Sequence, residues 1–198
     1  MIRKYHLGAA AMAMVAAFSM SSAAQAATAT ATAKAEIVKP LVFQNTSDLE
    51  FGKIVVAGAG TVAVAADGSA TCSTDLTCYS ATSAAGFEVT EGSIGKSVTI
   101  TMPSAVDLIR TGATDDGFGN FNDEDKIELG SYVTDATSTT IYDTDGTTVL
   151  GTTYSVTLAN DGAGNGAAEF AIGGTITLDG TEVEGAYEQV FNVSVEYS

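Results

Sequence analysis

The sequence predicts an all-β fold, an immunoglobulin-like β-sandwich of antiparallel strands. Apolar residues alternate with Thr or Ser in residues 98–102 (VTITM), 154–158 (YSVTL) and 176–178 (ITL), the pattern of half-buried strands. Asp-Gly pairs and other Gly clusters separate these runs, and Asp-Gly suits tight hairpin turns. An apolar period of 3.6 residues is almost absent. The number and spacing of the short strands therefore predict a sandwich.

The alternation places the strands in order along the chain. A bulge or bend is expected at Gly173-Gly174, since glycine inside a strand is typical of both. The longest irregular stretch is 104–125, with at most one short helical turn around Ala105 to Ile109. Strands are expected near residues 28–38, 49–56, 61–66, 86–90, 96–102, 127–133, 147–150, 153–159, 167–178 and 186–197.

The first 26 residues have the features of a secretory signal peptide. Arg3 and Lys4 precede an apolar stretch over residues 7–20, and Ala24-Gln25-Ala26 supplies the small residues of a cleavage site before Ala27. A membrane anchor is the alternative for this segment. We expect an exported protein of the periplasm, cell surface or extracellular space. No second apolar run is long enough to span a bilayer, so no integral membrane span is expected after cleavage.

Charge and composition exclude several function classes. The chain has 24 acidic and 8 basic residues and a net charge of −16. Loss of residues 1–26 removes two basic residues and His6, the one histidine, so the net charge becomes −18. Nucleic acid is not an expected partner, because its affinity comes mainly from Lys and Arg. Without imidazole, Trp or a phosphate-binding loop, no enzyme activity, catalytic residue or cofactor-binding residue is expected.

Two cysteines lie close together, at positions 72 and 78. In an exported chain, a local disulfide between Cys72 and Cys78 is the expected state. A metal site is the alternative, but it lacks a third Cys and a histidine.

Oxygen-bearing side chains crowd the stretch 115–125. Such a cluster is a weak candidate for Ca²⁺, which takes six to eight oxygen ligands. The spacing does not match a calcium-loop template, and a solvated acidic loop is the alternative. No other cofactor is expected. The candidate metal residues are Asp115, Asp116, Asn120, Asn122, Asp123 and Asp125, with Glu124 beside them.

Residues 27–38 (ATATATAKAEIV) alternate between two faces. One face carries Ala27, Ala29, Ala31, Ala33, Ala35 and Ile37. Methyl groups bury little apolar area, so this strand needs a surface against which to lie. It is predicted either to be the first strand of its own sandwich or to be a donor strand that completes a neighbouring subunit by β-augmentation.

The chain ends in an alternating strand in which Tyr187, Phe191, Val193, Val195 and Tyr197 share one face. Tyr197 is penultimate and Gly185 is fourteenth from the end. These residues, with LEFGKI at 49–54, resemble chaperone–usher pilin subunits and spore-coat-protein-U-like secreted domains. The segments FEVTEG, VTITMP, EFAIGGTITL and GAYEQVFNVSVEY resemble more closely an uncharacterised bacterial secreted domain family related to them, over most of residues 35–198.

The resemblance implies a pilin-like sandwich that lacks its last strand. A periplasmic chaperone would pair with the C-terminal strand, and the next subunit's N-terminal extension would replace it in a homo-polymer. Residues 27–37 would be the donor strand, and Gly185 to Tyr197 would border the acceptor groove. Two departures from pilins concern polymerisation: the cysteines lie later and closer together, and the Ala-rich donor face is small.

The sequence thus predicts a signal peptide (1–26), an N-terminal strand (27–38) and a sandwich domain (39–198). The expected function is that of an exported structural subunit of a cell-surface or fimbria-like assembly, joined by β-strand complementation. The alternative is a self-complete secreted binding domain, an adhesin or a Ca²⁺-dependent carbohydrate binder.

Overall fold

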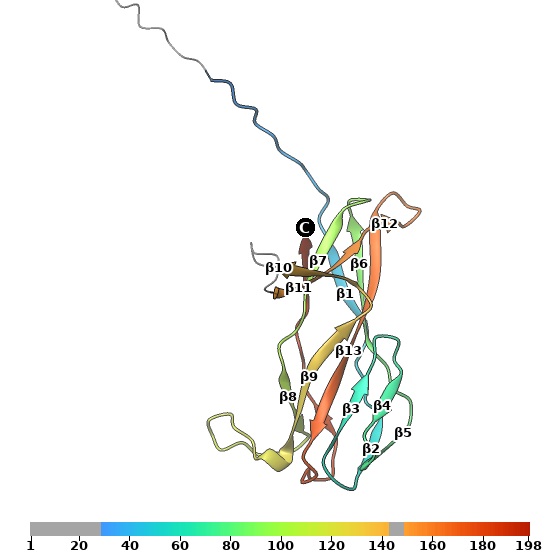
Figure 1. Ribbon diagram of the computed structural model, residues 1–198, viewed down its shortest axis with the longest axis vertical. Helices are drawn as coiled ribbons and strands as arrows, with labels where there is room; N and C mark the ends of the chain where they lie inside the picture. Colours follow the sequence, from blue (N-terminus) through green and yellow to red (C-terminus); the bar gives the residue numbers. More distant parts are fainter. Residues whose placement is uncertain (1–28, 143–148) are drawn as a thin grey trace, which may run out of the picture. The chain divides into compact units, whose positions relative to one another are not determined.

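The computed structural model describes residues 29–142 and 149–198, and these residues fold almost entirely as β-strands (Figure 1). The chain divides into two units, residues 1–36 and 37–198. The described part of the first unit, residues 29–36, contains no strand or helix. All strand pairs in the second unit are antiparallel, so the predicted all-β, immunoglobulin-like fold is confirmed.

The largest sheet is organised around β13 (Gly166–Leu178), which runs through the second unit (Figure 1). One edge of β13 pairs with β6 up to Ile172 and with β3 from Gly174 onward. On its other edge β13 pairs with β9, and the register shifts between Gly173 and Thr175, which confirms the expected irregularity at Gly173-Gly174. The sheet order is β1 (Val42–Ser47), β6 (Ala85–Gly92), β13, β9 (Lys126–Thr134), β8 (Val106–Arg110) and β14 (Tyr187–Glu188), with β3 (Gly60–Val64), β4 (Ala70–Cys72) and β12 (Ala159–Asn160) attached.

Two smaller sheets complete the described structure. The first has the order β10 (Thr137–Tyr142), β11 (Val149–Thr157), β7 (Ser97–Thr101) and β15 (Ser194–Tyr197). The second pairs β2 (Lys53–Val56) with β5 (Leu76–Tyr79). A single 3₁₀ turn, η1 (Asp123–Asp125), precedes β9.

The alternating apolar residues form two hydrophobic clusters along β13. Val89, Val98 and Leu158 are among the fully buried members of the first cluster, which β6, β7 and the first half of β13 build. Val62 and Leu129 are fully buried in the second, which β3, β8, β9 and the second half of β13 build. No helix in the part of the chain that the structure describes is long and apolar enough to cross a membrane.

The structure corrects three local predictions. The helical turn expected around residues 105–109 is wrong, because this stretch forms β8 and pairs with β9 and β14. The strand expected over 186–197 is divided into β14 and β15, which belong to different sheets. Residues 29–38, the described part of the expected N-terminal strand, form no strand. The sequence pattern does not predict strands β1, β4, β5 and β10 at their positions.

Candidate functional site

Strands β1 and β15 are edge strands that come close together at one end. Among the described residues, β1 pairs only with β6 and β15 only with β7. The Tyr197 hydroxyl donates a hydrogen bond of 2.8 Å to the carbonyl of Lys39, just before β1, and accepts one of 2.9 Å from the Ser93 amide. Tyr197 therefore connects the edges of β1 and β15, and the outer side of each edge forms no strand pair among the described residues.

Apart from Val42, which is exposed, the apolar side chains of these two edges are half buried. Phe191, Val193, Val195 and Tyr197 alternate with exposed polar residues on β15 and the segment before it. All four pack against the first hydrophobic cluster, as do half-buried residues at β1. We call these two edges the edge seam, lined by Leu41, Phe43, Val193, Val195 and Tyr197. The first core is thus incompletely covered along the edge seam.

An aromatic stack fixes β1 at the edge seam. The Phe43 ring lies 5.5 Å from the Phe87 ring and 6.0 Å from the Phe170 ring, centroid to centroid, and all three are stacked. Because β6 and β13 supply the other two rings, β1 is packed by its one large aromatic residue although most of its side chains are exposed.

A hollow of about 380 Å³ lies where the C-terminal segment leaves β7. Met102, Val106, Phe191 and Val193 are among its lining residues. The ring of Tyr132 packs 5.5 Å from that of Phe191, and the Tyr132 hydroxyl is buried without a hydrogen-bond partner among the described residues. Burial raises the pKa of Tyr132 above its ordinary value. The hollow thus adds an apolar recess beside β15 and adjoins a residue with an unsatisfied polar atom.

The predicted strand-exchange residues are only partly brought together. Phe191, Val193, Val195 and Tyr197 lie in one row, as expected. Gly185 does not border this row: a Cβ on it would lie 2.8 Å from Cγ of Arg110, so Gly185 packs against β8 before the chain changes sheets. Ala27 lies outside the described residues. Ala29, Ala31, Ala33, Ala35 and Ile37 are exposed, Ile37 to 97 %, and their pairing with a neighbouring subunit stays a prediction.

The acidic stretch forms an ordered loop whose carboxylates bond to the loop itself. Asp116 Oδ1 accepts hydrogen bonds from the amides of Phe118 and Asn120, and Oδ2 accepts one from the Asn120 side chain. The Asn120 side-chain bond, followed by the two amides, lowers the pKa of Asp116. Asp115 accepts from the Gly119 amide at 3.1 Å. These carboxylates therefore hold the backbone of the loop.

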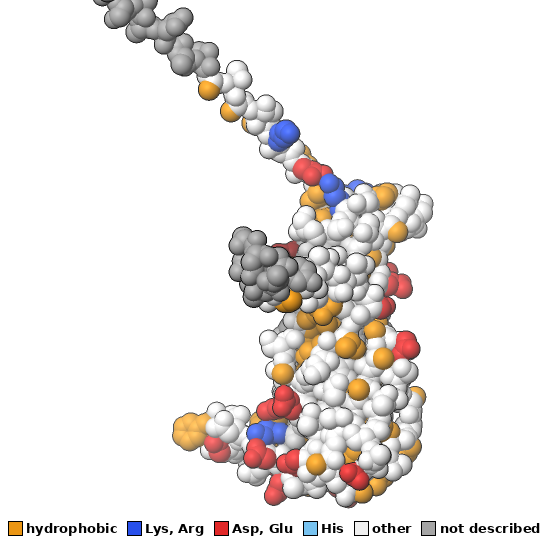
Figure 2. All heavy atoms as spheres, viewed as in Figure 1, with side chains coloured by type: hydrophobic (Ala, Val, Ile, Leu, Met, Phe, Trp, Pro, Cys, Tyr) orange, Lys and Arg blue, Asp and Glu red, His pale blue; other side chains and the backbone are white. Residues whose placement is uncertain are grey.

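The remaining candidate metal residues have other partners. Asp123 forms an ion pair of 2.9 Å with Lys126, and Asp125 is buried against Arg110, with 2.5 Å between Oδ1 and Nε. Asn122 precedes η1 and makes no capping side-chain bond. Figure 2 shows acidic side chains around the basic ones near this loop. Within residues 29–142 and 149–198, no three Asp, Glu, Cys or His side chains converge as metal ligands, so this geometry does not support the calcium hypothesis.

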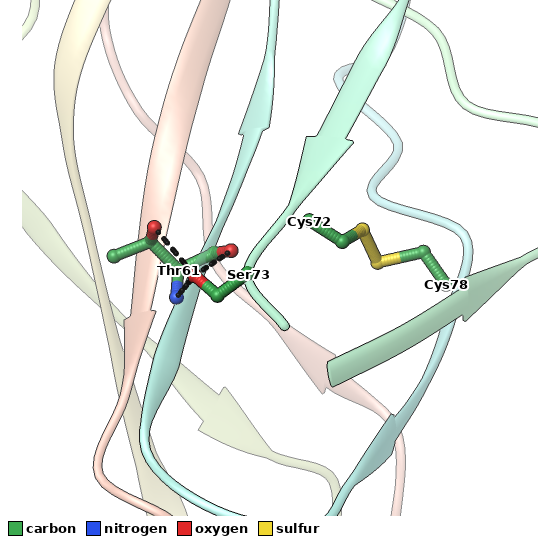
Figure 3. The surroundings of a disulfide bond; sticks show 4 residues. All are labelled: Thr61, Cys72, Ser73 and Cys78. Atoms are coloured by element: carbon green, nitrogen blue, oxygen red, sulfur yellow. Dashed lines mark hydrogen bonds between the residues drawn. A yellow bond between two sulfur atoms is a disulfide. The ribbon is translucent and has the colours of Figure 1, made fainter. Parts of the chain in front are cut away.

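The predicted disulfide is present and joins two sheets. Cys72 at the end of β4 bonds to Cys78 in β5, and β4 and β5 pair with different partners (Figure 3). Beside it, Ser73 Oγ donates to the carbonyl of Thr61 and accepts from its amide, at 3.0 and 2.8 Å. The disulfide and these bonds connect the β2–β5 pair to β3 and hence to β13.

The fold and the edge seam define an antiparallel β-sandwich domain with two open strand edges beside its core. The family model described as "Domain of unknown function (DUF4402)" matches residues 41–197, so the chain belongs to this family. No curated protein and no solved structure matches the chain. The matched range begins immediately before β1 and ends with β15, and therefore includes both strands of the edge seam.

Proposed function

We propose that the protein is an exported structural subunit of a cell-surface assembly, and that subunits join by β-strand complementation at the edge seam. The observation that carries this proposal is the incomplete cover over the first core. In the part of the chain that the structure describes, two strand edges without outer partners lie beside half-buried apolar side chains. An added strand would pair with the edges and cover these side chains.

The donor is residues 27–38 of the next subunit, in a homo-polymer. This segment alternates in period 2 and forms no strand over its described part. Its Ala face suits a shallow surface, and Ile37 is its one bulky apolar anchor on that face. Each main-chain hydrogen bond formed with an edge contributes about 0.5–1.5 kcal/mol. A periplasmic chaperone would occupy the same edge before assembly.

The experiment compares the protein with and without residues 27–38. We expect the full chain to form multimers that are separable by size-exclusion chromatography, and the truncated chain to be a monomer with a lower Tm. A synthetic peptide of residues 27–38 should restore stability. At a hundredfold excess over its Kd, the gain is about 2.7 kcal/mol, or about 5–10 °C in Tm for a domain of this size.

Two matched substitutions test the direction of the donor strand. Ala31→Glu places a charge on the Ala face and should abolish multimers, whereas Thr32→Glu places the same charge on the opposite face and should leave them intact. Equal effects of the two substitutions would contradict strand complementation. A stable monomeric full chain whose Tm collapses without residues 27–38 would favour the self-complete binding domain instead.

A further inference from the structure

Two loops of the protein have the same sequence pattern and the same internal hydrogen bonds. Asp116–Asn120 reads DGFGN, and Asp161–Asn165 reads DGAGN. In each loop the Asp Oδ1 accepts from the amides two and four residues later, the Asn side chain donates to Oδ2, and the Asp amide donates to the Asn carbonyl. Both glycines of each loop have a positive φ of 83–91°. The sequence therefore contained a signal, the repeated D-G-x-G-N pattern, that residue composition alone did not reveal.

The second loop binds a lysine of its own chain. Lys39 Nζ donates to the carbonyl of Gly164 and to Asn165 Oδ1, each at 2.8 Å. The loop supports this contact because the Asn165 amide nitrogen is bonded to Asp161, which leaves Oδ1 as the free acceptor. Formation of Asp161–Asn165 thus presents two oxygens, one carbonyl and one amide, to a primary ammonium group.

In the first loop, the two residues that carry the corresponding oxygens line a hollow at the surface. The Asn120 amide nitrogen is bonded to Asp116, so its Oδ1 is the acceptor left over, next to the Gly119 carbonyl. Among the residues that the structure describes, no side chain donates to these two atoms. Gly119, Asn120, Asp107 and Gln189 line a hollow of about 370 Å³, which also contains Lys126.

The charges around this hollow favour a cation. Asp107 in β8 lies opposite Glu128 in β9, and both are exposed, so two like charges face each other across the ladder. The ammonium of Lys126 is paired with Asp123 and also interacts with Asp107, but the three carboxylates of Asp107, Asp123 and Glu128 exceed this one positive charge by two. Because no three carboxylates among the described residues converge, this arrangement suits one ammonium group better than a metal ion.

Phe118 at the tip of the first loop is not needed for the fold. Its side chain is 90 % exposed, and the second loop forms the same hydrogen bonds with Ala163 in its place. Phe118 does not line the hollow, but its exposed ring next to Gly119 is available to cover the aliphatic stem of a bound side chain and to attract its charge.

We infer that Asp116–Asn120 is a docking site for a lysine side chain of a partner protein, bound as the second loop binds Lys39. The ammonium group donates to the Gly119 carbonyl and to Asn120 Oδ1, and Asp107, which also interacts with Lys126, supplies the opposite charge. This site is separate from the edge seam, so it does not depend on strand complementation.

The test is an NMR titration of the ¹⁵N-labelled protein with Nα-acetyl-lysine methylamide. We expect millimolar binding, with amide shifts at residues 117–120 and at Asp107, and none at residues 162–165, where Lys39 already occupies the loop. In the variant Lys39→Met, titration with the same probe should also shift the amides of residues 162–165, because Lys39 no longer occupies that loop. Asp107→Asn should weaken binding at the first loop about two- to fivefold.

Two further probes distinguish a lysine site from general attraction to an acidic protein. The Nε-acetylated probe lacks the charge and should cause no shifts, and Nα-acetyl-arginine methylamide should bind more weakly than lysine. The inference is overturned if all three probes bind alike or if the shifts are scattered over the acidic surface. It is also overturned if the lysine probe causes no shifts at residues 162–165 of Lys39→Met, provided that the spectrum of the free variant is otherwise unchanged.

Discussion

Gly173→Ala tests how closely β13 must approach β3. At Gly173, one edge of β13 changes its partner from β6 to β3. A Cβ added there would lie 2.1 Å from the carbonyl oxygen of Val64 and 2.7 Å from the carbonyl carbon of Ala65, whereas ordinary contacts are 3.4–4 Å. Both atoms belong to the backbone, so no side-chain rotation relieves the clash. The strands must separate, and the first pair of the β3 ladder, Gly174 with Val64, is disturbed.

The expected cost is about 3 kcal/mol or more, the range of strong overpacking in a core. For a domain of this size, this corresponds to a fall of about 6–12 °C in Tm. Thermal unfolding followed by circular dichroism measures the fall, and amide hydrogen exchange should show its origin as faster exchange in β3 (Gly60–Val64).

Gly130→Ala is the matched control. Its added Cβ would lie 3.4 Å from Cβ of Ala105, an ordinary contact, and Gly130 is also in a strand that pairs with β13. We expect a change within about 0.5 kcal/mol. If Gly173→Ala and Gly130→Ala lower Tm equally, the close approach of the β13 and β3 backbones does not explain why position 173 needs glycine.

Four other predictions concern separate features. Replacing Cys72 and Cys78 by Ser should lower the free energy of unfolding by about 2 kcal/mol, the loop-closure value for so short a loop, and an unchanged urea midpoint would contradict this. Tyr132→Phe removes a buried hydroxyl that has no hydrogen-bond partner in residues 29–142 and 149–198, so stability should rise by about 1 kcal/mol; a lower Tm would show that the hydroxyl has a partner. Asp116 and Asp161 are held ionised by hydrogen bonds from Asn120 and from the amide of Asn165, so both pKa values lie below 3.8. Their stabilisation should be complete above pH 3.8 and lost as the pH falls through the lower folded values, and carboxyl-carbon NMR midpoints at or above 3.8 would refute this. Millimolar Ca²⁺ should leave Tm unchanged, and a rise would restore the calcium hypothesis.

Local patterns predicted the strands whose residues alternate regularly. The VTITM and ITL runs became β7 and the end of β13, because alternation places one face in the core wherever the partner strand lies. The VDLIR segment of β8 has apolar residues at spacings of two, one and three, which fit a helical turn equally well. Its pairing with β9, about twenty residues later, decides the conformation, and local sequence does not contain that information.

The same limit applies to the edge seam. Its C-terminal half, Phe191 to Tyr197, was predictable from alternation, but the division between β14 and β15 was not, since it depends on pairing with β8 and β7. The other half is β1, whose sequence VFQNTS is mostly polar. Only the stack of Phe43 on rings from β6 and β13 identifies it as a packed strand.

Lys39 gives the domain a mechanical anchor at the point where the chain enters it. Its amide donates to Ser93, its ammonium to Gly164 and Asn165, and its carbonyl accepts from Tyr197. A pulling force transmitted through the residues before Lys39 is therefore divided among four bonds to three separate segments before it reaches β1. These bonds must therefore carry the force before it reaches the pairing of β1 with β6.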